Sequence, residues 1–183
     1  VLIGVELQDA AVATQPGDVQ RIQHLCRRQP GEVVCGVEGM QEGRQAVGAT
    51  ASPDDWRVGK SIFVGPDEAT AKRYALQEGG PYHFYFKQLV RKLVSGVGRS
   101  NLFKTAPNMP DSEITPDYVT QRLVLAGTVN SVVDQILAFR EQVGDFGTLV
   151  YACHDWQDKQ LGQRSMELFA TEVMPRVNKA LGQ

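Results

Sequence analysis

Strand-like and helix-like segments alternate through most of the chain, and this alternation constrains the fold more than any other feature. The spacing of apolar residues predicts a strand over 58–64, followed by helices over 67–77 and 82–94. Further along, it predicts the best-formed helix of the chain over 129–143, directly before an apolar strand over 147–153. Strands that alternate with helices indicate an α/β fold in which the strands pair in parallel.

The length of the chain limits how much of an α/β architecture it can hold. It has 183 residues, whereas a complete eight-stranded barrel typically needs about 250 and rarely fewer than about 200. We therefore expect one α/β domain over residues 1–183, as either a small open sheet or a portion of a barrel. Residues 1–49 stay unassigned. Their weak patterns are a strand over 1–5, a helix over 18–28 and a strand over 32–35.

Three further segments complete the expected architecture. A short helix is predicted over 118–125. Apolar residues four apart over 161–181 predict a last helix, which Pro175 should kink or split because proline removes a donor and crowds the preceding turn. Residues 95–116 hold glycine, serine, asparagine and proline, so we expect an excursion or a lid there rather than a packed element.

The composition argues against several classes of protein. The formal net charge is −2 and Lys and Arg are scattered, which gives no electrostatic basis for binding nucleic acid or an acidic membrane. No segment approaches the roughly 18–20 apolar residues of a membrane-spanning helix. No His/Cys cluster and no HExxH pattern predicts a metal site. The cysteines, which we expect to be reduced thiols in a cytoplasmic protein, are Cys26, Cys35 and Cys153.

A histidine, an aspartate and a tryptophan follow the strand predicted over 147–153. Groups at the carboxyl ends of strands are the ones that α/β folds present to a ligand. His154 would act there through a hydrogen bond or a proton transfer, or would only bond a neighbouring carbonyl group. Asp155 would orient His154 or stabilise the turn, and Trp156 would line an apolar pocket or pack in the core. The sequence leaves each of these alternatives open.

Aromatic residues recur at helical spacing along the helix predicted over 82–94. Tyr82, Tyr85 and Phe86 form this stripe, which predicts either a wall for a lipophilic substrate or a part of the core. His83 falls between the stripe positions, so we expect its side chain to be solvated.

Four stretches of the chain share features with one known family, in the order that the family has. The first is a late barrel strand followed by the acidic, alanine-rich start of a helix, and the second is the start of another helix. The third is the final strand with the residues that follow it, and the fourth is the last helix. They are residues 56–73, 127–136, 146–156 and 164–175. Together they resemble the C-terminal part of the bacterial-luciferase-like, flavin-dependent monooxygenases over residues 50–180. The aromatic helix and the proline-rich excursion are similar to those of the diketocamphane and limonene monooxygenases.

The resemblance implies a partial (β/α)8 TIM-barrel-like fold, made of the C-terminal portion of a luciferase-like barrel. It implies a monooxygenase that uses reduced FMN and O2 on a small apolar carbonyl or alkene, with a flavin reductase or another supply of reduced flavin as partner. Under this interpretation His154 is the catalytic residue and contacts the cofactor together with Asp155. The residues that would contact the substrate are Trp156, Tyr85 and Phe86.

Two alternatives belong to other classes of protein. In the first, the chain is a non-catalytic or truncated partial barrel that binds flavin weakly or needs a partner chain, because residues 1–49 do not match the family pattern. A missing barrel half would leave strand edges uncovered, and we therefore expect a homo-oligomer. The second is a small α/β binding domain unrelated to flavin, which holds only if the resemblance over residues 50–180 arises by chance.

Overall fold

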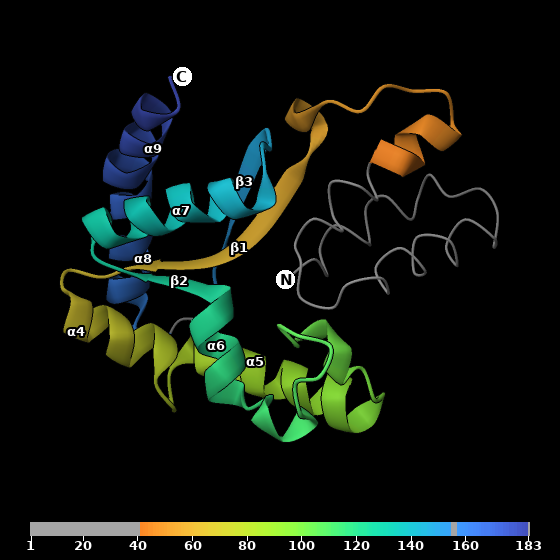
Figure 1. Ribbon diagram of the computed structural model, residues 1–183. Coiled ribbons are helices and arrows are strands. Elements are labelled where there is room, and N and C mark those ends of the chain that lie inside the picture. Colours follow the sequence, from red (N-terminus) through yellow and green to blue (C-terminus); the bar gives the residue numbers. More distant parts are fainter. Residues whose placement is uncertain (1–40, 155–156, 183) are drawn as a thin grey trace. The chain divides into compact units, whose positions relative to one another are not determined.

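The computed structural model describes residues 41–154 and 157–182 (Figure 1). The elements predicted within residues 1–40 therefore lie outside the described residues, and so do Asp155 and Trp156. The same holds for Cys26 and Cys35.

The described residues contain one sheet of three strands (Figure 1). The strands are β1 (Arg57–Val64), β2 (Val124–Gly127) and β3 (Thr148–Ala152), in the order β2-β1-β3. β1 pairs with β2 in parallel, with Ser61 opposite Val124. The predicted strands over 58–64 and 147–153 are confirmed. The helix predicted over 118–125 ends earlier than expected, because its last residues open β2 instead.

β3 runs in the same direction as β1. The N–H of Thr148 donates to the carbonyl of Trp56 just before β1, at 3.2 Å. At the other end, the side chain of Ser61 hydrogen-bonds that of His154, which follows β3. The carboxyl ends of β1 and β3 therefore lie at the same edge of the sheet, which is the edge where α/β folds bind ligands. The predicted α/β fold with parallel strands is confirmed.

The helices follow the strands as the apolar spacing predicts. After β1 come α4 (Glu68–Ala71), a π-helical turn (Lys72–Leu76), α5 (Pro81–Val90), a second π-helical segment (Arg91–Gly96) and α6 (Pro116–Leu123). After β2 comes α7 (Val129–Val143), and after β3 come α8 (Lys159–Leu168), a π-helical segment (Phe169–Val173) and α9 (Met174–Ala180). Pro175 does not split the last helix, because the chain stays helical from residue 159 to residue 180. The π-helical segment Phe169–Val173 lies directly before the turn that holds Pro175, where proline removes a backbone donor.

The excursion predicted over 95–116 contains two short 3-10 turns, Ser100–Leu102 and Asp111–Glu113. It is more ordered than the sequence suggests, because it buries three apolar side chains. These are Phe103, Met109 and Ile114. The structure leaves the predicted role as a lid untested.

The chain packs as two compact units. Among the described residues, one unit comprises 41–59, Ser100–Asp111 and 140–150, and the other comprises Lys60–Arg99, Ser112–Phe139, 151–154 and 157–182. In the first unit, the rings of Trp56 and Phe146 meet edge to face at 6.2 Å. The Nη1 of Arg140 donates to the carbonyl of Phe146 at 2.9 Å. The single domain expected over residues 1–183 stays a prediction.

The core of the second unit joins the sheet to its helices. Ile62 and Phe63 of β1 are fully buried, as is Val132 of α7. The Oγ of the fully buried Ser165 accepts a hydrogen bond from the N–H of Val64 at 2.7 Å and shares another with the hydroxyl of Tyr151 at 3.1 Å. This serine therefore connects α8 with two strands of the sheet.

We expect Ser165→Ala to lower the free energy of unfolding by about 1–3 kcal/mol, because the buried N–H of Val64 then loses its acceptor. Urea denaturation followed by circular dichroism measures this change. Thr171→Ala is the matched control, since it removes a hydroxyl that bonds the carbonyl of Glu167 on an exposed surface. Its effect should stay within about 0.5 kcal/mol. Equal effects of the two substitutions would contradict the connecting role of Ser165.

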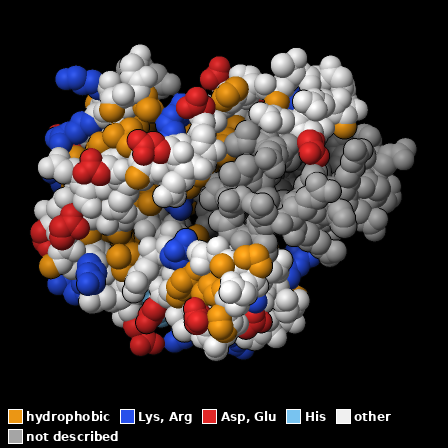
Figure 2. Space-filling model, in the orientation of Figure 1, with side chains coloured by type: hydrophobic (Ala, Val, Ile, Leu, Met, Phe, Trp, Pro, Cys, Tyr) orange, Lys and Arg blue, Asp and Glu red, His pale blue; other side chains and the backbone are white. Residues whose placement is uncertain are grey.

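The surface of the described residues is mixed in character. Acidic and basic side chains are interspersed on the face shown in Figure 2, which accords with the formal net charge of −2. Among the described residues no helix is both long and apolar enough to cross a membrane.

Candidate functional site

His154 lies directly beyond the carboxyl end of β3 and is half-buried. Its Nε2 is 3.0 Å from the Oγ of Ser61 on β1. One of the two atoms donates and the other accepts, depending on the tautomer of the imidazole. The hydroxyl group therefore fixes the ring in one orientation at the ligand-binding edge of the sheet.

Three aromatic rings of α5 surround the imidazole of His154. The ring of Tyr85 stacks on it at 4.1 Å between centroids, with 24° between the planes. The ring of Tyr82 meets it edge to face at 4.8 Å, and that of Phe86 lies at 6.1 Å. The structure thus gathers three residues that the sequence proposed for the site, namely His154, Tyr85 and Phe86.

The aromatic residues around His154 differ in their exposure. Tyr82 is fully buried and Phe86 is 4% exposed, so both belong to the core behind the imidazole. Tyr85 is 42% exposed, so its ring remains available to a ligand. The stripe on α5 is therefore partly core and partly surface, and Tyr85 is its accessible member.

The phenol groups close to His154 are held neutral by their surroundings. The hydroxyl of Tyr82 donates to the carbonyl of Ile62 at 2.6 Å, and burial raises the pKa of this phenol far above its usual value. Burial also raises the pKa of Tyr151, whose hydroxyl hydrogen-bonds Ser165. At physiological pH neither phenol carries a charge into the site.

Sequence reasoning missed Ser61 and the burial of Tyr82. Ser61 is a polar residue within an otherwise apolar strand, which is a weak signal that its side chain has a partner. Cys153, which precedes His154, is exposed and forms no disulfide with any described residue.

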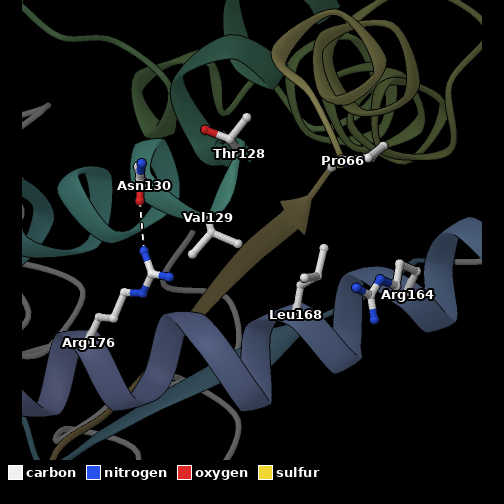
Figure 3. Close-up of a pocket in the computed structure, with 8 residues that line it drawn as sticks. Pro66, Thr128, Val129, Asn130, Arg164, Leu168 and Arg176 are labelled. Atoms are coloured by element: carbon white, nitrogen blue, oxygen red, sulfur yellow. Dashed lines mark hydrogen bonds between the residues drawn. The ribbon is translucent and has the colours of Figure 1, made fainter.

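A cleft of about 490 Å³ opens at the carboxyl ends of β1 and β2 (Figure 3). Its lining consists of Gly65, Pro66, Thr128, Val129, Asn130, Arg164, Leu168 and Arg176. Arg176 already bonds the carboxylate of Glu172 and the amide oxygen of Asn130, each at 2.8 Å. Arg164 pairs with Glu167 at 3.2 Å. Because both guanidinium groups have acidic partners, this cleft is not a free anion site.

A second cleft of about 300 Å³ lies beside the segment that leads from β3 to α8. Its lining consists of Arg73, Tyr74, Glu78, Gly79, Gly80 and Gln157. The side chain of Gln157 donates to the carbonyl of Gly79 at 2.8 Å, and the N–H of Asp158 donates to the hydroxyl of Tyr74 at 3.3 Å. These bonds join the chain shortly after His154 to the turn before α5 and to the π-helical turn Lys72–Leu76.

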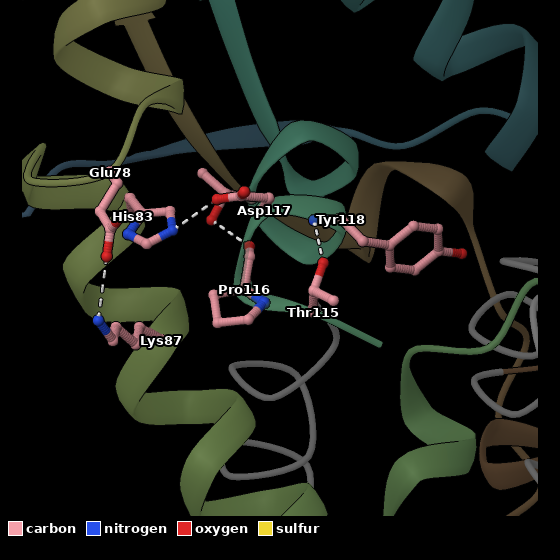
Figure 4. Close-up of polar contacts among 8 residues, drawn as sticks. Glu78, His83, Lys87, Thr115, Pro116, Asp117 and Tyr118 are labelled. Carbon is pink, nitrogen blue, oxygen red and sulfur yellow. Dashed lines mark hydrogen bonds and ion pairs between the residues drawn. The ribbon is translucent and has the colours of Figure 1, made fainter. Parts of the chain in front are cut away.

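His83 has a different environment from the one that the sequence predicts. It is 4% exposed rather than solvated, and its Nε2 lies 2.8 Å from the Oδ1 of Asp117 (Figure 4). Asp117 lies in the first turn of α6, so the pair joins the start of α6 to α5. The helical spacing did not predict this burial, because the polar imidazole of His83 is stabilised by a carboxylate, that of Asp117, which is distant in the sequence. Among the described residues, no group of acidic, histidine and cysteine side chains is arranged to hold a metal ion.

The sequence is similar to those of several known monooxygenases. No family profile matches the chain. It is 30% identical over 142 residues to 4-hydroxyprotoasukamycin monooxygenase of Streptomyces nodosus subsp. asukaensis, covering 73% of this chain and 33% of that protein. It is 24% identical over 135 residues to 3,6-diketocamphane 1,6-monooxygenase of Pseudomonas putida, covering 72% of this chain and 35% of that protein.

A solved structure resembles the fold. The oxygenating constituent of 3,6-diketocamphane monooxygenase from Pseudomonas putida, a type II Baeyer-Villiger monooxygenase in complex with FMN, superposes with a TM-score of 0.66. The match has 22% sequence identity and covers 79% of this chain and 40% of that chain. This likeness confirms the predicted fold, a part of a luciferase-like barrel.

These findings confirm the resemblance to the luciferase-like flavin monooxygenases, with diketocamphane-type enzymes among the relatives. The chain spans about a third of the length of the curated relatives that it matches.

Proposed function

We propose that the chain is part of a flavin-dependent monooxygenase that uses reduced FMN and O2 on a small apolar carbonyl or alkene. The observation that carries this proposal is the position of His154. Its imidazole lies at the ligand-binding edge of the sheet, bonded to Ser61 and stacked on the half-exposed Tyr85. The relatives are monooxygenases, and the structural neighbour was solved with FMN.

The residues around His154 suit the ring end of a flavin. An isoalloxazine ring is flat and amphipathic, so it stacks on aromatic side chains and hydrogen-bonds polar groups at its edge. Tyr85 offers the exposed ring, and His154 offers the hydrogen-bonding group. The arginines of the cleft at the ends of β1 and β2 have carboxylate partners, so we assign no residue to the phosphate end.

FMN, when bound, supplies the activation of O2. The residues of the chain position the bound ligand and shield it from water. The hydrogen bond between Ser61 and His154 orients the imidazole, which can exchange a proton with a ligand atom at the edge of the sheet. Tyr82 and Phe86 exclude water from the inner side of the imidazole. We also propose Asp155 as a cofactor contact and Trp156 as a substrate contact, and we propose a flavin reductase as partner and a cytoplasmic location.

A titration of the purified protein with FMN tests the proposal. Binding should shift the visible absorption bands of FMN and quench its fluorescence, with saturation below high micromolar FMN. Activity is then measured with an added NADH-dependent flavin reductase and a bicyclic ketone as substrate. The absence of any FMN binding at high micromolar concentration would overturn the proposal for this chain.

Two substitutions on α5 distinguish an effect on the candidate site from a general effect on the helix. Tyr85→Ala should weaken FMN binding about tenfold, because the stacking surface beside His154 is lost. Phe84→Ala is the matched control, since Phe84 is the neighbouring aromatic residue, is 61% exposed and has no ring contact with His154. Fluorescence titration of both variants measures the difference. If the two variants bind FMN equally well, Tyr85 is not part of the site.

His154→Ala tests the proposed catalytic residue by two separate measurements. FMN binding should weaken, and oxygen transfer with reductase-supplied flavin should fall by a further 10²-fold or so, the range typical of a lost acid–base group. Unchanged binding together with unchanged oxygen transfer would remove His154 from the site.

The chain covers only about a third of the length of its relatives, and this favours a second candidate function. In this alternative, the chain is a partial barrel that binds flavin and catalyses no reaction unless another chain completes the barrel. The candidates differ in one respect that can be measured. Saturable FMN binding without any oxygen transfer would favour the partial barrel, whereas both together favour the monooxygenase. Sedimentation velocity would show at the same time whether the chain forms the expected homo-oligomer.

A further inference from the structure

The second cleft, beside the segment that leads from β3 to α8, contains a cation that forms no ion pair with any described residue. Arg73 lines this cleft of about 300 Å³ and is exposed. Arg164 and Arg176 of the larger cleft differ in this respect, because each of them pairs with a glutamate. The guanidinium group of Arg73 is therefore accessible to an anionic ligand.

The acidic groups near Arg73 are engaged by other partners. Asp67 attracts Arg73 electrostatically, but its carboxylate caps α4 and accepts hydrogen bonds from the N–H of Thr70 at 2.7 Å and from its hydroxyl at 2.9 Å. Glu78 lines the cleft and forms an ion pair with Lys87 at 3.3 Å. Because Lys87 offsets the charge of Glu78, the positive charge of Arg73 favours a ligand that carries a negative group.

The rest of the lining suits a hydroxylated chain. Tyr74 and Gln157 bring a hydroxyl and an amide group to the cleft, and groups of these kinds hydrogen-bond the hydroxyls of a sugar alcohol. Gly79 and Gly80 contribute backbone without side chains. The cleft thus combines polar groups for such a chain with one cation for an anionic end.

The second cleft lies within reach of the candidate site for the flavin ring. Gln157 follows His154 by three residues, so their Cα atoms are at most about 11 Å apart. Gly80 precedes Tyr85 by five residues at the start of α5, which corresponds to a rise of about 7.5 Å. All of these residues belong to the same compact unit. The ribityl phosphate chain of FMN extends over a comparable length, so one FMN molecule can reach both places.

We propose that Arg73 binds the phosphate group of FMN, while the flavin ring occupies the site at His154 and Tyr85. This assignment rests on the function proposed above. A guanidinium group donates two parallel hydrogen bonds to a phosphate, and such charge-assisted bonds are stronger than those between neutral groups. Arg73 therefore selects FMN over riboflavin, which has the same ring and ribityl chain but no phosphate group.

Titrations with FMN and with riboflavin test the proposal, with the quenching of flavin fluorescence as the measurement. The wild-type protein should bind FMN about tenfold more tightly than riboflavin, and Arg73→Gln should bind the two flavins equally. Lys72→Gln is the matched control, because Lys72 is the exposed neighbour of Arg73, carries the same charge and does not line the cleft. This control variant should keep the preference for FMN.

The dependence on salt tests the same contact in the wild-type protein. Raising the ionic strength from about 0.01 M to about 1 M shortens the Debye length from about 30 Å to about 3 Å. FMN binding should therefore weaken relative to riboflavin binding, and this difference should disappear in Arg73→Gln.

The outcomes separate this proposal from the proposed function. Equal binding of FMN and riboflavin by the wild-type protein would overturn the assignment of Arg73 and leave the ring site in place. An equal loss of FMN binding in Arg73→Gln and Lys72→Gln would also overturn it, because the effect would then come from net charge alone. Binding of neither flavin would overturn the proposed function together with this assignment.

Discussion

Gly80→Ala is expected to lower the free energy of unfolding by about 2–4 kcal/mol. A Cβ at this position would lie 2.2 Å from the carbonyl oxygen of Tyr74 and 3.2 Å from that of Gln77. Both are backbone atoms and cannot rotate away. The backbone dihedrals of Gly80 are ordinary, with φ −76° and ψ 157°, so the effect is steric and not conformational. Chemical denaturation measures the change.

Gly80→Ala should also disturb the candidate site. Gly80 is the residue directly before α5, whose rings surround His154, so a displaced helix start would loosen the stacking on Tyr85. Gly59→Ala is the matched control, because a Cβ there meets nothing within 4 Å. If Gly80→Ala is as stable as Gly59→Ala, the close approach between Gly80 and Tyr74 does not exist in solution.

Lys60→Met is expected to stabilise the protein at pH 7 by about 2–3 kcal/mol, and this gain should vanish as the pH rises. Lys60 of β1 is 6% exposed, and its burial, together with the positive charge of Arg122, lowers its pKa from 10.5 to about 8 in the folded protein. Between these values the unfolded chain binds more protons than the folded chain, so the stability of the wild-type protein rises with pH in this window. Below pH 8 both states are protonated and the full penalty for burying the ammonium group remains.

Denaturation of both proteins between pH 7 and 10.5 measures this dependence. Other groups also titrate in this range, but they are common to the two proteins and cancel in the difference. The difference between Lys60→Met and the wild type should be largest at pH 7 and should shrink through the window. A difference that stays constant with pH would show that the amine of Lys60 is solvated in the folded protein.

Local patterns predicted much of the architecture. The apolar residues over 58–64 located β1, although both faces of this strand are buried from Lys60 to Val64. The 3.6-residue spacing located α7, because this periodicity follows from the face that a helix buries. Pro175 did not split the last helix, which continues through a π-helical segment into α9. β2 was missed, because four residues are too few to establish a period of two.

The contacts that build the candidate site could be predicted only in part. His154 was proposed from its place after a strand, and Tyr85 from its place in an aromatic stripe. Their stacking depends on how α5 packs against the sheet, which no local pattern states. The bond between Ser61 and His154 joins residues 93 positions apart. His83 was misjudged for the same reason, since its partner Asp117 comes from another helix.

The central claim is that the surface formed by His154 and Tyr85 receives the ring of a flavin. The most direct measurement is the transfer of magnetisation between the methyl protons of the isoalloxazine ring and the ring protons of the protein, by nuclear Overhauser spectroscopy of the FMN-saturated protein. We predict contacts to the ring protons of Tyr85 and His154. Contacts that instead fall on the cleft lined by Arg164 and Arg176, with none to Tyr85 or His154, would contradict the claim.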